Sequence, residues 1–291
     1  KAMKLYSKMT AEAVASVAKK ICDEKTGEVV LVSLARAGTP VGILIKHYIE
    51  KKLGRSAYHY TISIIRGKGI DKNAMSYILV RHSPESIQFV DGWTGKGAIQ
   101  RELSQAMKDY PNVSAGLAVL SDPAGIAEKA GTHDDFLIAS SCLNSTVSGL
   151  LSRTFYRSDI IGPTDFHGAA FYKELLSKDL TYTFINAVES CFPDVPSLLD
   201  EGELSMSGMD EVKVICHDFN IKDINLVKPS IGEATRVLLR RMPWKVLVHS
   251  LDDYEHLGHL YQLAFEKGIQ LEEYPLKNYR ACGLIQSLAD N

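Results

Sequence analysis

The sequence predicts an α/β protein built on a largely parallel sheet, followed by a second, smaller α/β domain. Apolar runs rich in β-branched residues alternate with helical patterns, which requires crossover connections between parallel strands. The chain has 291 residues, of which 45% are hydrophobic, enough to bury two cores. Glycine-containing loops follow several candidate strands, and a parallel sheet binds its ligands beyond the carboxyl ends of its strands. We therefore expect these loops to gather at one edge and to form the ligand site.

The first expected elements lie before residue 66. A helical pattern over residues 10–22 begins at Thr10, whose hydroxyl suits an N-cap. A buried strand over residues 28–34 follows, and Thr39 before a proline predicts the start of the next helix. An alternating pattern over residues 58–65 predicts another strand.

Strands and helices continue to alternate through the middle of the chain. We expect strands at 76–80, 86–90, 115–121 and 134–141, and a helix at 98–108. The four strands and the two before them would complete the sheet of the first domain.

The pattern is less regular beyond residue 150. The run 193–208 is acidic and rich in turn residues, which is typical of a boundary between domains. Strand and helix patterns resume after it, so we place the domains at residues 1–218 and 219–291.

Composition excludes some classes of function. The formal net charge is −2, so no overall basic field favours nucleic acid, and any such site must be local. No apolar run reaches the roughly 20 residues that cross a bilayer, so we expect no membrane segment. The five cysteines form no C-x-x-C pair, which favours a reduced, cytoplasmic protein.

The loop "DGWTGKG" (residues 91–97) has the chemistry of a phosphate site. Its glycines allow backbone N–H groups to converge at a helix N-terminus, where the partial charge is positive. Thr94 supplies a hydroxyl and Lys96 a full charge for a terminal phosphate, and Asp91 suits a pair of sugar hydroxyls. A plain turn is the alternative for this loop taken alone.

Two further loops offer positive charge on the same edge. The turn from Arg36 to Thr39 precedes a capped helix start and suits a diphosphate-like group. Arg66 and Lys68 in "RGKG" provide mobile charge, as a lid over a polyanion requires.

These segments resemble a known family. "IQFVDGWTGKGAI" followed by "GLAVLSDPAG" is similar to the phosphoribosyl-pyrophosphate loop and next strand of type I phosphoribosyltransferases. "VVLVSLARAGTPVG" resembles their pyrophosphate loop and "YTISIIRGKGI" their flexible catalytic loop. More narrowly, "KPSIGEATRVLLRR" and "SCLNSTVSGLLSRT" resemble the phosphoribosyltransferase proteins of bacterial tellurite-resistance stress operons, some described as StiP-type cysteine proteases. Gly92 and Trp93 depart from the family, which has a second acid and a longer spacer there.

The resemblance implies a type I phosphoribosyltransferase fold with a hood insertion at about residues 150–210. It implies ribose 5-phosphate transfer between phosphoribosyl pyrophosphate, or a nucleotide, and a nitrogenous base of unknown identity, in the synthesis of a ribonucleoside-like stress metabolite. Arg66, Lys68 and Asp91 would be catalytic. The phosphoribosyl pyrophosphate would be bound by Arg36, Ala37, Gly38, Thr39, Asp91, Thr94, Gly95, Lys96 and Gly97. Mg²⁺ would be carried by the substrate with no protein metal site, and a homodimer is compatible with this interpretation.

The segment "SIGEATRVLL" with the strand "KVLVHS" resembles the Pelota-type RNA-binding domain. The resemblance implies contact with structured RNA through Lys228, Gly232, Glu233 and Arg236. Arg240 and Arg241 extend this local basic patch. A solvated helix face is the alternative.

Other functions remain open on the sequence. A StiP-type cysteine protease would use Cys142, with Asp165 and His167 as partners. An RNA-binding module with an inactive transferase domain is a second alternative. A zinc site at His249, His256 and His259 is a weaker one, since no fourth ligand stands at a telling spacing.

Overall fold

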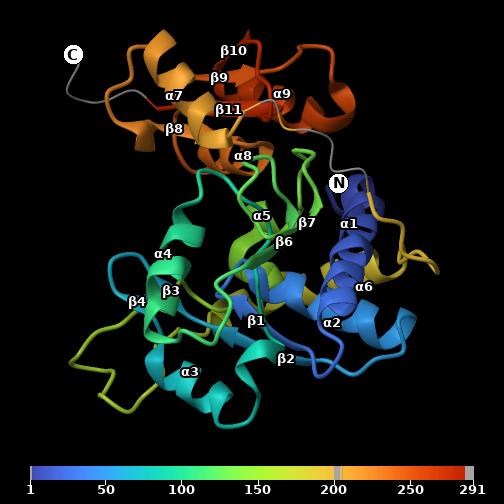
Figure 1. Cartoon of the computed structure of the whole chain (residues 1–291). Coiled ribbons are helices and arrows are strands. Elements are labelled where there is room, and N and C mark those ends of the chain that lie inside the picture. The colour runs from blue at the N-terminus through green and yellow to red at the C-terminus, as the bar shows by residue number, and fades with distance from the viewer. Residues whose placement is uncertain (1, 200–203, 205, 286–291) are drawn as a thin grey trace.

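The computed structural model describes residues 2–199, 204 and 206–285, which form two units, each around its own sheet (Figure 1). The first unit holds a five-stranded parallel sheet in the order β2-β1-β5-β6-β7. Its strands are β1 (Val30–Leu34), β2 (Tyr58–Ile62), β5 (Ile87–Val90), β6 (Leu117–Ser121) and β7 (Lys129–Thr132). The expected α/β class with a parallel sheet is confirmed.

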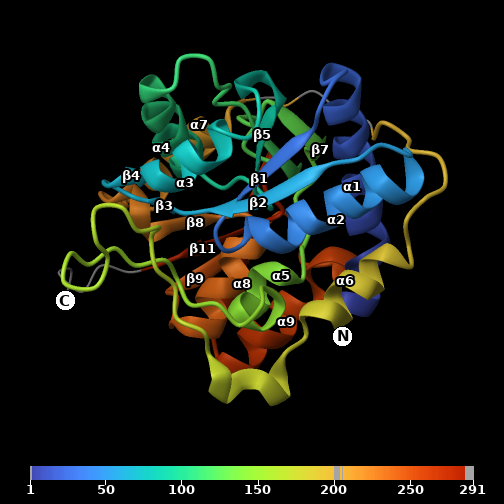
Figure 2. The same cartoon turned by 90° about the horizontal axis from the view of Figure 1, so that it is seen from below.

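Helices cover both faces of this sheet (Figures 1 and 2). One face carries α1 (Ala2–Glu24), α2 (Gly38–Lys52) and α6 (Thr181–Glu189), and the other carries α3 (Lys72–Leu79) and α4 (Ala98–Ala106). Alternate strand residues serve the two faces, because successive side chains of a strand point in opposite directions. Leu31 packs with α1 and α2, whereas Val30 and Val32 pack with α3 and α4.

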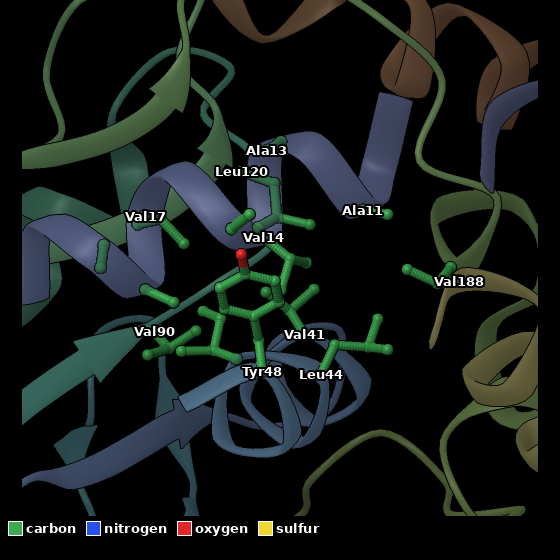
Figure 3. Packing of buried hydrophobic residues seen from close by; sticks show 14 of the residues in the cluster. Ala11, Ala13, Val14, Val17, Val41, Leu44, Tyr48, Val90, Leu120 and Val188 are labelled. Atoms are coloured by element: carbon green, nitrogen blue, oxygen red, sulfur yellow. The ribbon is translucent and has the colours of Figure 1, made fainter. Parts of the chain in front are cut away.

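The layer between α1 and α2 is closely packed (Figure 3). Tyr48 of α2 points toward α1, where Val14 faces it. The Tyr48 hydroxyl donates a hydrogen bond to the carbonyl of Pro193 at 3.0 Å, so this large buried ring keeps its polar atom satisfied.

The second unit holds a mixed four-stranded sheet in the order β10-β9-β11-β8, in which β11 is antiparallel to both neighbours. Its elements are α7 (Gly208–Asp218), β8 (Val227–Pro229), α8 (Ile231–Arg240), β9 (Lys245–Val248), α9 (Tyr254–Lys267), β10 (Gln270–Glu273) and β11 (Ala281–Leu284). Val212 and Ile215 of α7 pack with Leu247 of β9. Helix α7 therefore packs with the second sheet, although we expected the first domain to extend to residue 218.

Short elements complete the chain. A small hairpin joins β3 (Ile64–Ile65) to β4 (Gly69–Ile70), and α5 (Ser140–Leu143) precedes an irregular excursion, residues 150–180, in the region expected as a hood. Short 3₁₀ turns lie at Pro84–Ser86, Met107–Asp109, Asn144–Val147, Lys173–Lys178 and Ile224–Leu226. Part of the acidic run at 193–208, and the last six residues of the second expected domain, lie outside the described residues.

Two expected strands are wrong. Residues 76–80 belong to α3 and the turn after it, because Met75 and Ile78 face the core at helical spacing and Asp71 caps the helix through the Ala74 N–H. Residues 134–141 contain no strand, and β7 lies a few residues earlier.

Two expected helix caps are also wrong. Helix α1 already begins at Ala2, so Thr10 is inside it and donates its hydroxyl proton to the Tyr6 carbonyl at 2.7 Å. Helix α2 begins at Gly38 without a side-chain cap. A Cβ at position 38 would lie 2.6 Å from the Val90 carbonyl oxygen, so glycine allows α2 to start against the end of β5.

Asp135 joins the two units. Its buried carboxylate accepts hydrogen bonds from the backbone N–H of Ile231, at the start of α8, at 3.0 Å and of Arg280, before β11, at 2.9 Å. Burial raises the pKa of Asp135 from the ordinary value of 3.8 to about 7, against the effect of these N–H donors. One side chain of the first unit therefore fixes two elements of the second.

No described helix is both long and apolar enough to span a bilayer.

Replacing Asp135 should weaken this joint. We expect Asp135→Ala to lower the free energy of unfolding by about 3 kcal/mol, because two buried N–H groups lose their acceptor. Chemical denaturation at pH 7 measures the change.

Asp135→Asn is the matched control, since it keeps one acceptor oxygen and removes the titration. The folded-state pKa of Asp135 is raised, so its protonated form contributes favourably to the free energy of unfolding. This contribution is fully present below about pH 4 and is lost as the pH rises through 7. The stability of the natural protein relative to Asp135→Asn should therefore fall between pH 4 and pH 8. A difference that is flat over this range would contradict the assignment.

Candidate ligand-binding cleft

A cleft of about 910 Å³ lies where the loops of the first sheet meet α8 of the second unit. Both sets of residues expected to bind ligands contribute to its lining, although they were predicted for different ligands. Those from the first unit are Arg36, Ala37, Arg66, Asp91, Thr94, Gly95, Lys96 and Gly97, and those from the second are Lys228, Glu233 and Arg236. The loops that follow β1 and β5 of the parallel sheet therefore meet the turn of the β3–β4 hairpin at one edge, as we expected.

Four expected residues do not line the cleft. Gly38 lies under the start of α2, and the Thr39 hydroxyl accepts a hydrogen bond from Thr61 at 3.3 Å. The Lys68 ammonium lies over the ring of Tyr156, 5.6 Å from its centre. Gly232 packs on Trp93: a Cβ there would lie 3.2 Å from Trp93 Cε2, so glycine lets the indole lie against α8.

The loop at residues 91–97 is held by the second unit. Lys96 Nζ donates hydrogen bonds to the carbonyls of Ile224 at 2.6 Å and Val227 at 2.9 Å. The hydroxyl of Tyr279 donates to the Gly95 carbonyl at 2.8 Å. Burial, together with the nearby charge of Lys228, lowers the pKa of Lys96 to about 8. In this arrangement the lysine binds backbone carbonyls of the other unit.

Thr94 and Asp91 differ in how many hydrogen bonds their side chains make within the protein. The hydroxyl of Thr94 donates to the Asp122 carboxylate, which also accepts from the N–H groups of Ile126 and Ala127. Asp91 accepts only from the Gly92 N–H, at 2.8 Å, among the hydrogen bonds of the described chain. Burial raises its pKa to about 6, and the nearby positive charge of Arg236 opposes that shift. Asp91 therefore keeps an acceptor oxygen for a ligand.

Six arginines of the described chain line the cleft. Four of them are close enough for their charges to interact, and we call these the arginine cluster: Arg36, Arg153, Arg236 and Arg240. Burial lowers the pKa of Arg36, and the charges of the other three members lower it further. Arg36 donates to the Leu151 carbonyl at 2.7 Å, and Arg236 pairs with Glu233 at 2.7 Å. In the described part of the chain, the guanidinium groups of the other two members form no hydrogen bond or ion pair. The cluster thus carries more positive than negative charge, which favours a polyanionic ligand.

Arg153 was not predicted from the sequence. It lies on the irregular excursion, whose path over the cleft follows no helical or strand period. The arginines of α8 were predicted because the residues of this helix resemble a family pattern, whereas no such pattern includes Arg153.

The thiol set considered from the sequence is not brought together. Cys142 contacts the Ser141 hydroxyl and packs with the second unit's core. His167 contacts Ser63 and, through its backbone N–H, Asp71. No hydrogen bond joins a cysteine to a histidine among the residues described.

Burial raises the pKa of Cys142, while Ser141 and two members of the arginine cluster, Arg236 and Arg240, oppose the shift. Ser140 and Ser141, the two residues before it in α5, line the cleft. The thiol is therefore next to the cleft but is not activated in this arrangement.

The histidines of the second unit have other partners. His249 and His256 both bind the Asp253 carboxylate, at 2.7 and 2.8 Å. His259 lies between the hydroxyls of Tyr6 and Thr235. Nowhere in the described ranges do three His, Cys, Asp or Glu side chains gather as metal ligands.

Comparison with known proteins divides the chain in two. Residues 1–189 match the family described as "Tellurite-like stress resistance cysteine protease StiP", and residues 206–287 match the "PELOTA RNA binding domain". The chain is 37% identical to "Cysteine protease StiP" of Acinetobacter baylyi, over 99% of this chain and 80% of that protein.

Similarity to solved structures is weaker. A hypoxanthine phosphoribosyltransferase of Trypanosoma cruzi is 14% identical and covers 43% of this chain and 77% of its own, with a TM-score of 0.34. A structure titled as a glutamine mutant of an invariant aspartic acid in HPRTs is 16% identical over 43% of this chain and 76% of its own, also with a TM-score of 0.34.

The expected phosphoribosyltransferase activity is wrong by these comparisons. The relative that matches almost the whole chain is named a cysteine protease, whereas the transferases match less than half of it and at a low TM-score. The structure adds a physical reason, because the lysine expected to bind the phosphate binds carbonyls of the second unit.

Removing the Lys96 ammonium should loosen the joint. We expect Lys96→Met to lower the free energy of unfolding by about 2 kcal/mol, because two carbonyls lose their donor. Hydrogen exchange of residues 224–229, followed by mass spectrometry, should be faster in this variant.

Lys228→Met is the control, because this lysine lines the same cleft without a hydrogen bond from its ammonium in the described structure. If hydrogen exchange of residues 224–229 were as slow in Lys96→Met as in Lys228→Met, the Lys96 ammonium would not join the units.

Proposed function

The chain belongs to the StiP family of tellurite-like stress resistance proteins and, because it joins that family's domain to a Pelota-type segment, we propose that it binds RNA in the cleft between its units. The arginine cluster carries this proposal. RNA presents a chain of phosphates, and binding releases the counterions that surround them.

The guanidinium group suits this ligand. It presents a planar fork of N–H donors that matches two oxygens of a phosphate, and it stays charged at any physiological pH. Arg36 and Arg236 are half-buried, whereas Arg153 and Arg240 are exposed, so the cluster extends from the inside of the cleft to its mouth. A phosphate chain could follow this line of charge without unfolding either unit.

Other residues of the cleft suit the ribose. Asp91 has an acceptor oxygen, and the 2′-hydroxyl of RNA is a donor that DNA lacks. Lys228 adds charge from the Pelota-type segment. Any Mg²⁺ in this cleft would be carried by ligand phosphates, since hard oxygen ligands suit it best.

Truncating the exposed arginines should weaken RNA binding. We expect Arg153→Ala and Arg240→Ala each to reduce affinity about tenfold, in line with loss of a charge-assisted contact of roughly 1.5 kcal/mol. Each should also make the slope of log K against log salt less steep by about 0.7, the value for one single-strand phosphate. Fluorescence anisotropy with a labelled RNA at several salt concentrations measures both.

Arg81→Ala is the matched control, because Arg81 stacks on Tyr77 at the end of α3 and does not line the cleft. If all three variants bound RNA equally well, the cleft would not be the binding site.

Thiol-dependent peptide hydrolysis is a second candidate function. The family description favours it, and Cys142 is the cysteine whose sequence neighbours, Ser140 and Ser141, line the cleft. Activation would require the thiol to become exposed and to gain a general base, because the thiolate is the nucleophile.

Substitution and labelling test this candidate. If Cys142 is the nucleophile, Cys142→Ala abolishes hydrolysis of a denatured protein substrate and Cys191→Ala leaves it intact. We expect iodoacetamide to label Cys142 slowly at pH 7, because burial raises its pKa. Full hydrolysis by Cys142→Ala would exclude this residue as the nucleophile.

A further inference from the structure

We infer that the cleft takes single-stranded RNA and that a base of the strand stacks on Tyr156 at its mouth. This inference rests on the proposed RNA binding and specifies its substrate class. It follows from the size of the cleft, from the half-buried position of the Arg36 charge in it, and from the exposed ring of Tyr156 beside it.

The cleft is small for a double helix. Its volume of about 910 Å³ is that of a pocket for a small molecule. A duplex is a wide rod with its phosphates on the outside, so its backbone would reach only the exposed arginines. Arg36 lines the cleft and is half-buried, and its guanidinium donates to the Leu151 carbonyl. A single strand is thin enough to bring a phosphate to it.

The excursion that carries Arg153 leaves the body of the first unit between α5 and α6 (Figure 2). Arg153 and Thr154 line the cleft, and Tyr156 follows two residues later with 40% of its surface exposed. A strand that leaves the cluster along this segment therefore meets an aromatic ring.

The surroundings of Tyr156 resemble a stacking platform. Its ring lies 4.7 Å from the His167 ring, at an angle of 40°, which supports it from one side. The Lys68 ammonium lies over the ring, 5.6 Å from its centre, on a flexible side chain that turns to an adjacent phosphate when a base takes its place. Phe166 and Phe171 on the same excursion are also more than half exposed, at 53% and 55%. Aromatic rings interleaved with basic side chains are the usual means of binding single strands, whose unpaired bases stack on them.

The test compares two RNA probes with the full chain. One is a labelled 12-nucleotide single strand of mixed sequence. The other contains the same 12 nucleotides paired with their complement in a blunt hairpin stem. We expect the single strand to bind at least tenfold more tightly than the stem. Tyr156→Ala should weaken single-strand binding about tenfold, the lower part of the range for loss of one stacked base, while Tyr156→Phe should bind as the natural protein does.

Tyr182→Ala is the control, since this tyrosine of α6 is 78% exposed and lies outside the cleft lining. Thermal melting of each variant shows that it is folded. Equal affinity for the two probes would overturn the inference. The inference would also be overturned if Tyr156→Ala bound the single strand as tightly as the natural protein while Arg240→Ala bound it more weakly. In that case the proposed RNA binding would still hold. Failure of both probes to bind the natural protein would overturn both proposals.

Discussion

The buried carboxylate of Asp135 is the interaction on which the cleft depends. It accepts the N–H groups of Ile231 and Arg280 and so fixes α8 and β11 against the first sheet. Lys96 and Tyr279 complete the joint by donating hydrogen bonds to backbone carbonyls of the opposite unit. Because the arginine cluster takes two members from each side of this joint, it exists only while the units are docked. Loss of docking would therefore remove the site without changing any of its residues.

The loop at residues 91–97 shows how one set of groups can serve a different purpose from the expected one. Its lysine, hydroxyl and glycines are the groups that suit a phosphate. In the folded chain the lysine binds carbonyls of the second unit, and Thr94 binds Asp122. The loop thus serves as a joint, and the task of attracting an anion falls to the arginines around it. Asp91 remains the member of this loop whose chemistry is open to a ligand.

Much of the fold followed from local pattern, and the failures have physical causes. The buried strands, and the meeting of their loops at one edge, were predicted because β-branched runs alternate with helices. Residues 76–80 are apolar enough for a strand, but only helical spacing buries Met75 and Ile78 together. Asp135 was missed as the joint because its role depends on two N–H groups 96 and 145 residues away in the sequence. Arg153 was missed because nothing in its neighbourhood shows which surface the excursion covers.

The most direct measurement is ultraviolet crosslinking of the natural chain to a single-stranded RNA, followed by mass spectrometry of the crosslinked peptides. Binding of the strand in the cleft predicts crosslinks in peptides of both units, one covering residues 151–156 and another covering residues 228–241. Crosslinks confined to α9 or α3, neither of which contributes to the cleft lining in the described chain, would contradict it.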